Sequence, residues 1–308
     1  MKSFKQIYEE ALSSIVKEGG NAIPDVDRIA KDTIFKTVDD FKRNILREFF
    51  GYEPKKECFL LGSTGKKKDS GDIDIGIDVN ALKDTNVITN LIKLNEICAK
   101  RGLNSCINSI NFKMLHVAYP QIGEEPKKVQ IDVLFTDCPE FTKFFMFSPE
   151  ENESRYKGAH RNALIHAILY CISYKPLQFD EDNQPMKWMQ LDIDDDGIFR
   201  QLKTLIDEKG NRLLYKSTDE PLEPAYAKVE RAVKVCNDVS SAIEMFAGAN
   251  ITEQDIRSFE SFFKLINDDS RFKYKSLREE IFKKCAKDLF LAKSRLEFPE
   301  ELREYLKV

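Results

Sequence analysis

The sequence predicts an α+β fold, in which a small mixed sheet with helices is followed by a helical C-terminal half. Apolar residues recur at helical spacing over residues 26–49 and again from residue 225 onward. Between these regions, short apolar stretches alternate with polar residues in the manner of strands, and one helical stretch interrupts them. Helices and strands segregated along the chain in this way are typical of an α+β domain.

Two helices are predicted before the first strand. Apolar side chains follow a helical period over residues 4–16 and over residues 26–49. The Gly19-Gly20-Asn21 sequence separates the two helices, and Gly51 with Pro54 ends the second.

The middle of the chain is predicted to form the sheet. Apolar and alternating stretches indicate strands, a longer periodic stretch indicates one helix among them, and a further helix follows. The predicted segments are strands near 59–61, 72–78, 106–110, 112–119 and 127–136, and helices over 82–100 and 151–174.

The second half of the chain is predicted to be a linker followed by a helical bundle. Prolines and glycines punctuate residues 175–224. Three segments from residue 225 onward carry apolar residues at helical spacing, the first of them around residues 229–236. We therefore expect a domain over residues 1–175, a linker or insert over 176–224 and a helical domain over 225–308.

Two carboxylates stand at alternate positions of the strand Asp72-Ile73-Asp74-Ile75. Because side chains alternate across a strand, Asp72 and Asp74 project from one face while the isoleucines pack on the other. Paired carboxylates make half of a site for a hard divalent cation such as Mg²⁺, which often shares its ligands with nucleotide phosphates. A strand with merely solvated charges is the alternative.

A glycine-serine turn and a run of lysines precede this strand. Gly62 and Ser63 follow the apolar Phe59-Leu60-Leu61 stretch, and Lys66, Lys67 and Lys68 come next. Backbone N–H groups in such a turn, with nearby positive charge, are suited to cradling phosphates. The segment is not a P-loop, because Lys67 stands where that motif needs Ser or Thr, and the chain has no G-x-G-x-x-G fingerprint.

This arrangement resembles the signature of the DNA polymerase β-type nucleotidyltransferase superfamily, which includes poly(A) polymerases, CCA-adding enzymes and oligonucleotide synthases. The family also has a third carboxylate on a later strand. Asp132 within Val129-Gln130-Ile131-Asp132-Val133 matches it, since apolar residues flank it at odd positions.

The resemblance implies a metal-dependent nucleotidyltransferase. Asp72, Asp74 and Asp132 would bind Mg²⁺ or Mn²⁺ and carry the catalysis, while Gly62, Ser63 and some of the lysines, Lys66 and Lys67 among them, would hold the phosphates of an NTP. The acceptor would be an RNA end, a protein or a small molecule. A cyclic or linear oligonucleotide synthase and a catalytically inactive scaffold of the same fold are the alternatives.

A basic face is predicted on the helix over residues 151–174. Lys157, His160 and Arg161 lie at i, i+3 and i+4 and so share one side of the helix. Lys157 and Arg161 are candidate nucleotide contacts, with a solvated helix face as the equal alternative. His166 stands among apolar residues and is predicted to be a satisfied core histidine.

A partial calcium-loop motif begins at Asp192. Oxygen-bearing residues occupy its positions one, three and five and Gly197 its position six, but Arg200 and Lys203 stand at positions nine and twelve. We expect a turn here, with Asp196 capping a following helix.

The composition restricts the classes of function. With 48 basic and 52 acidic side chains the net charge is −4, which disfavours a protein that coats nucleic acid. Seven scattered cysteines without C-x-x-C pairs indicate neither a disulfide framework nor a zinc site. No signal-peptide core or apolar membrane-length run is present, so we expect a cytoplasmic protein without membrane contact. Its oligomeric state is open.

Overall fold

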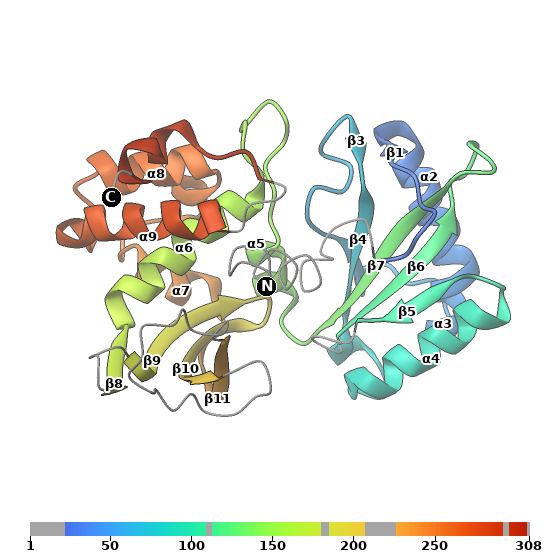
Figure 1. The fold of residues 1–308 in the computed structure, drawn as a ribbon. Helices are drawn as coiled ribbons and strands as arrows, with labels where there is room; N and C mark the ends of the chain where they lie inside the picture. Colours follow the sequence, from blue (N-terminus) through green and yellow to red (C-terminus); the bar gives the residue numbers. More distant parts are fainter. Residues whose placement is uncertain (1–21, 109–112, 180–184, 207–225, 292–295, 307–308) are drawn as a thin grey trace, which may run out of the picture. The chain divides into compact units, whose positions relative to one another are not determined.

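The structure is a computed structural model of the chain, and it describes residues 22–108, 113–179, 185–206, 226–291 and 296–306 (Figure 1). The chain divides into two compact units between residues 159 and 160. The domain boundaries predicted from the sequence lie after residues 175 and 224. The expected α+β fold is confirmed, with a small mixed sheet and its helices in the first unit and helices at the end of the second. The helix predicted over residues 4–16 lies outside the described residues.

A five-stranded mixed sheet forms the centre of the first unit. In spatial order its strands are β2 (Cys58–Leu60), β4 (Asp72–Asp78), β7 (Lys128–Thr136), β6 (Met114–Pro120) and β5 (Ser105–Ile107). β4 and β7 run parallel to each other, and the other neighbouring pairs are antiparallel. A separate short antiparallel pair joins β1 (Ile29–Ala30) to β3 (Asp69–Ser70).

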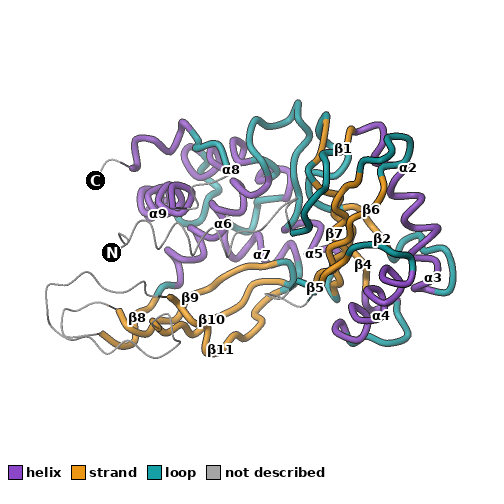
Figure 2. The backbone as a smooth tube through the Cα atoms, turned by 45° about the vertical axis from the view of Figure 1, so that its right-hand side comes forward, coloured by secondary structure: helices purple, strands orange, loops and turns teal. Residues whose placement is uncertain are grey.

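Helices cover one face of this sheet (Figures 1 and 2). The helix predicted over residues 26–49 runs from α2 (Lys31–Phe41) through a π-helical stretch (Lys42–Leu46) into α3 (Arg47–Phe50). Gly51 ends it in the left-handed conformation, with φ of 82°. α4 (Val87–Lys100) packs beside it.

The core lies between these helices and the odd-numbered positions of β4 and β7. Phe41 and Phe49 from the helical layer pack in one cluster with Ile73, Ile75 and Ile131, all of them fully or almost fully buried. Because side chains alternate, the even-numbered positions, where the aspartates stand, face away from this core. The helix α5 (Pro139–Phe145) contacts β4.

The second unit combines a helix, an antiparallel sheet and a helical end. α6 (Gly158–Ser173) precedes a four-stranded sheet in which consecutive strands pair, and three helices follow. The strands are β8 (Lys175–Phe179), β9 (Pro185–Asp194), β10 (Gly197–Ile206) and β11 (Tyr226–Cys236), and the helices are α7 (Val239–Phe246), α8 (Phe259–Asp268) and α9 (Arg278–Leu291).

The helix predicted around residues 229–236 is wrong, because these residues belong to β11. Glu230 and Val235 have no partner in the pairing of β11 with β10, so each is the extra residue of an irregularity. Two such bulges break the two-residue alternation of a strand and make its apolar spacing resemble that of a helix.

The turn predicted at Asp192–Gly197 is present, but Asp196 caps no helix. The segment is the tight connection between β9 and β10, where Asp194 pairs with Gly197. The Asp196 backbone N–H donates to Asp194 Oδ1 at 2.8 Å, which fixes the turn.

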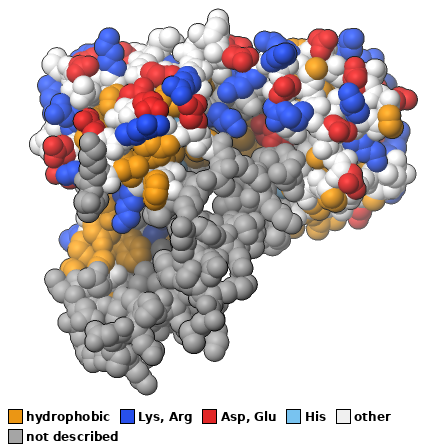
Figure 3. All heavy atoms as spheres, turned by 45° about the horizontal axis from the view of Figure 1, so that its top comes forward, with side chains coloured by type: hydrophobic (Ala, Val, Ile, Leu, Met, Phe, Trp, Pro, Cys, Tyr) orange, Lys and Arg blue, Asp and Glu red, His pale blue; other side chains and the backbone are white. Residues whose placement is uncertain are grey.

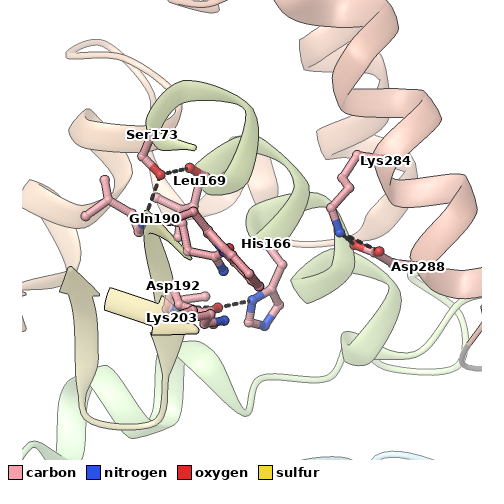
Figure 4. A network of polar contacts seen from close by, with 11 residues as sticks. His166, Leu169, Ser173, Gln190, Asp192, Lys203, Lys284 and Asp288 are labelled. Atoms are coloured by element: carbon pink, nitrogen blue, oxygen red, sulfur yellow. Dashed lines mark hydrogen bonds and ion pairs between the residues drawn. The ribbon is translucent and has the colours of Figure 1, made fainter. Parts of the chain in front are cut away.

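His166 links α6 to this sheet (Figure 4). Its Nδ1 lies 2.8 Å from Asp192 Oδ1, and Lys203 Nζ donates to Asp192 Oδ2 at 3.0 Å. His166 is therefore satisfied as predicted, but its side chain is 38% exposed and does not belong to the core. Burial alone would raise the pKa of the Asp192 carboxyl, but the hydrogen bonds and charges of His166 and Lys203 outweigh it and lower that pKa well below its usual range.

Charged side chains of both signs are interspersed on the face shown in Figure 3. That face carries no continuous basic surface in its described part, in keeping with the small net charge. Among the described residues, none of the helices combines the length and the apolar character needed to cross a bilayer.

We predict that Asp192→Asn destabilises the protein by about 1–3 kcal/mol at pH 7, because it weakens two charge-assisted hydrogen bonds. A carboxyl with a lowered folded-state pKa stabilises above its unfolded pKa of about 4 and loses that contribution as pH falls toward the folded pKa. The difference in melting temperature between wild type and variant should therefore narrow below pH 4. Glu244→Gln, at an exposed position of α7, is the control, and a pH-independent difference would contradict the role of Asp192.

Candidate metal centre and glycine turn

Three carboxylates converge on the face of the five-stranded sheet that points away from the core with α2 to α4. The parallel register of β4 and β7 places Asp74 opposite Asp132 and Asp72 opposite Gln130. One ligand atom from each of Asp72, Asp74 and Asp132 lies within 4.8 Å of the other two. The structure thus brings together the three aspartates that the sequence nominated.

Proximity and burial raise the pKa values of the two β4 carboxyls. Burial and the charge of Asp132 raise the pKa of Asp72 to about 6, although Lys157 and Arg28 act in the opposite direction. Burial, Asp72 and Asp132 raise the pKa of Asp74 well above its usual range. Without a compensating cation, the fully ionised cluster is therefore electrostatically unfavourable.

The donor set fits a hard divalent cation. All three side chains offer carboxylate oxygens, which are the ligands that Mg²⁺ and Mn²⁺ take. A cation between them would remove the repulsion that raises the pKa values of Asp72 and Asp74. The three residues could therefore hold such an ion.

The glycine turn, residues 61–67, is packed directly against Asp74. Leu61 N–H donates to the Asp74 carbonyl at 3.0 Å, and the Asp74 N–H donates to Thr64 Oγ1 at 2.9 Å. Gly62 has φ of 60°, and a Cβ at this position would lie 2.4 Å from Asp74 Oδ2. Only glycine allows the backbone of the turn to approach the carboxylate so closely.

The residues of this unit that are predicted to contact phosphate differ in their exposure and in their partners. Ser63 and Lys67 are half-buried in the turn. Lys66 Nζ donates to the Ser148 carbonyl at 2.7 Å and lies 4.3 Å from the centre of the Phe147 ring, so it holds the turn to the segment after α5. Lys157 is exposed, and its charge reaches Asp72, since it lowers the pKa of that carboxyl.

Arg161 and His160 belong to the second unit. Arg161 is 2% exposed and donates through Nη2 to Asn162 Oδ1 at 3.0 Å. Burial lowers its pKa to about 10. His160 Nε2 lies 2.7 Å from the Glu297 carbonyl oxygen. The assignment of Arg161 to nucleotide binding stays a prediction.

Sequence reasoning missed His116 and Arg28 and gave Gln130 no role. His116 Nδ1 and Gln130 Nε2 each lie 2.8 Å from Asp132 Oδ1. Arg28 pairs with Asp69, and a Cβ on Gly71 would lie 3.4 Å from its Nη1, so its positive charge stands beside the start of β4. The one available signal was the polar His116 within the apolar strand Leu115-His116-Val117.

The matches to known proteins come from solved structures alone. No protein-family model matches the chain, and no curated protein matches it in sequence. Among solved structures, Cid1 matches at 12% identity and a TM-score of 0.28 over 54% of this chain and 44% of Cid1, in a study of structural plasticity as the basis of its RNA terminal uridylyl transferase activity. The match spans less than half of Cid1, and a TM-score of this size carries no weight for fold or function.

We predict that Asp74→Asn raises the melting temperature of the metal-free protein by a few degrees at pH 7.5. When the pKa of a carboxyl is higher in the folded than in the unfolded state, the free energy of unfolding falls as pH rises above the unfolded pKa of about 4. The loss grows until the pH passes the folded-state pKa, and it remains at higher pH. The variant removes one of the clustered charges and so removes part of this cost.

Mn²⁺ should raise the melting temperature of the wild type and leave that of Asp74→Asn almost unchanged. Asp78→Asn, on the same strand but outside the cluster, is the matched control and should respond to Mn²⁺ as the wild type does. A wild type whose melting temperature does not respond to millimolar Mn²⁺ would contradict a metal centre here.

We predict that Gly62→Ala weakens Mn²⁺ binding at least about 10-fold, because its methyl group displaces the Asp74 carboxylate. Gly51→Ala is the matched control: Gly51 also has positive φ, 82°, but a Cβ there would meet nothing within 4 Å. Both variants carry similar backbone strain, about 1–2 kcal/mol. Titration calorimetry should therefore find the loss of affinity in Gly62→Ala alone, and equal affinities would show that the close approach is immaterial.

Proposed function

We propose that the chain is a metal-dependent nucleotidyltransferase of the DNA polymerase β type, which transfers a nucleoside monophosphate from an NTP to an acceptor hydroxyl. The observation that carries the proposal is the convergence of Asp72, Asp74 and Asp132 on one sheet face, next to a glycine turn. Three carboxylates, a glycine turn with backbone N–H groups and positive charge nearby suit phosphoryl chemistry.

The carboxylates are proposed to hold Mg²⁺, or Mn²⁺ in its place. When bound, such ions neutralise phosphate charge, lower the pKa of the acceptor hydroxyl and stabilise the pyrophosphate that leaves. Asp72 and Asp74 come from one strand and Asp132 from its neighbour, so their spacing is set by the sheet. A rigid sheet is a suitable support for this geometry.

The triphosphate is proposed to lie along the Gly62-Ser63 turn, whose backbone N–H groups and Ser63 hydroxyl can donate to phosphate oxygens. Lys157 and Arg28, the two cations that lower the pKa of Asp72, would attract the same phosphates. Lys67 adds charge from the turn, and Lys66 fixes the turn through Ser148. We therefore assign both the binding of the cation and triphosphate and the reaction itself to the first unit.

The proposed reaction forms one bond and breaks one. The acceptor oxygen bonds to the α-phosphorus, and the bond from that phosphorus to the oxygen bridging to the β-phosphate breaks. Pyrophosphate leaves with the electron pair of the broken bond, and the acceptor hydroxyl releases its proton. The acceptor is an RNA end, a protein or a small molecule, or a second nucleotide if the product is a cyclic or linear oligonucleotide.

The test is incubation of the purified protein with each α-³²P-labelled NTP, in Mg²⁺ or Mn²⁺, with and without total RNA. We expect metal-dependent release of pyrophosphate and transfer of label. Asp72→Ala and Asp74→Ala should lower the rate at least about 100-fold, equivalent to about 2.7 kcal/mol, whereas Asp78→Asn should keep most of it.

The destination of the label identifies the acceptor. Label on RNA or on protein supports transfer to a macromolecule, and a small phosphatase-resistant product supports the oligonucleotide synthase. If no NTP reacts under any of these conditions, the proposed function is wrong and the inactive scaffold is favoured. If either alanine variant keeps full activity, the proposed role of the aspartates in the reaction is wrong.

A further inference from the structure

Two buried side chains hold the carboxylate of Asp132 from the interior of the sheet. His116 stands directly opposite Asp132 on the neighbouring strand β6, with Nδ1 2.8 Å from Asp132 Oδ1. Gln130, two residues before Asp132 and on the same face, donates from Nε2 to the same oxygen at 2.8 Å. Gln130 is 0% exposed, Asp132 5% and His116 6%.

The orientation of Gln130 is fixed by backbone groups. Its Oε1 accepts from the Ala22 N–H at 2.9 Å and from the Ile23 N–H at 3.1 Å. Backbone N–H groups can only donate, so the oxygen of the amide must face them and the NH₂ group must face Asp132. Gln130 is thus a donor to Asp132.

The tautomer of His116 follows from its partner Asp132. An ionised carboxylate can only accept, so the Nδ1 that lies 2.8 Å from Asp132 Oδ1 carries the proton. The other ring nitrogen, Nε2, lies 3.3 Å from Asn108 Nδ2. His116 therefore donates to Asp132 and contacts Asn108 through the far side of its ring.

Both donors converge on one oxygen of the carboxylate. Oδ1 accepts from His116 and from Gln130, which leaves Oδ2 with the greater capacity to bind a cation. Fixing one oxygen also fixes the rotation of the carboxylate, which is otherwise free to turn about its last bond. Groups that hold a ligand in this manner commonly tune metal affinity by 10–100-fold.

We propose that His116 and Gln130 are positioning residues that hold Asp132 with Oδ2 directed to the bound cation, an inference that rests on the proposed function of the site. His116 acts through Asp132 and makes no contact with substrate in this scheme. The pair also explains how the carboxylate of Asp132, whose side chain is only 7% exposed, can stand on this face, since it accepts two hydrogen bonds.

The test compares His116→Leu with His116→Asn. Leucine removes the donor, whereas the side-chain amide of asparagine can place an N–H close to the position of Nδ1. We expect Mn²⁺ affinity, measured by electron paramagnetic resonance of the free ion, to fall about 10–100-fold in His116→Leu and to recover to within about 3-fold of wild type in His116→Asn.

Tyr119→Phe is the matched control. Tyr119 lies on the same strand, is also buried, and donates to Asp40 Oδ2 at 2.7 Å on the side of the helices. Its substitution should lower the melting temperature and leave Mn²⁺ affinity unchanged, which separates loss of stability from loss of positioning. A folded His116→Leu variant with wild-type Mn²⁺ affinity would overturn the proposal.

If His116→Leu does not fold, Asn108→Ala takes its place, because Asn108 is only half-buried and its Nδ2 lies 3.3 Å from His116 Nε2, where it helps to hold the ring. Its Mn²⁺ affinity should fall about 3- to 10-fold, and an unchanged affinity would again refute the proposal. The Mn²⁺ affinity of these variants is measured without NTP turnover, so it tests the positioning role independently of the proposed reaction. A protein that binds Mn²⁺ in this pattern but uses no NTP would contradict the nucleotidyltransferase and leave the positioning role intact.

Discussion

The pairing of β4 with β7 in parallel is the constraint on which the candidate site depends. It sets Asp74 directly beside Asp132 although the two are far apart in the chain. The register is specified by the opposite face, where Ile73, Ile75 and Ile131 are fully buried against helices. A shift by one residue would turn Asp132 into that apolar core and is therefore strongly disfavoured.

The same sheet holds the carboxylates close together although their mutual repulsion is unfavourable. Mutual repulsion and burial raise the pKa values of Asp72 and Asp74, so the cluster is unfavourable without a cation. Hydrogen bonds to Asp132 from His116 and Gln130, and the close turn at Gly62, hold the carboxylates in place. Charge repulsion gathered at one place in an otherwise well-packed unit is typical of a functional site.

Local patterns in the sequence predicted the parts of the site that lie within single strands. The alternation of Asp72 and Asp74 with isoleucines, and the apolar neighbours of Asp132, are each visible in a few residues. The helix ending at Gly51 was predicted for the same reason, since its period and its stop are local.

Features that depend on pairing between distant segments could not be predicted. The short pairing of β1 with β3 brings Arg28 beside the start of β4, and the pairing of β6 with β7 brings His116 onto Asp132. The apolar residues of β11 have a helix-like spacing, so the sequence predicted a helix there. The bulges of this strand become visible only in its pairing with β10. The contact of Lys66 with Ser148 likewise depends on the path of the chain after α5.

Anomalous diffraction from a crystal of the protein with Mn²⁺ and a non-hydrolysable NTP is the most direct test of this site. We predict a manganese peak within bonding distance of oxygens of Asp72, Asp74 and Asp132, with Oδ2 as the ligand atom of Asp132 and the phosphates along the Gly62-Ser63 turn. Manganese bound elsewhere, or a triphosphate away from this sheet face, would contradict this prediction.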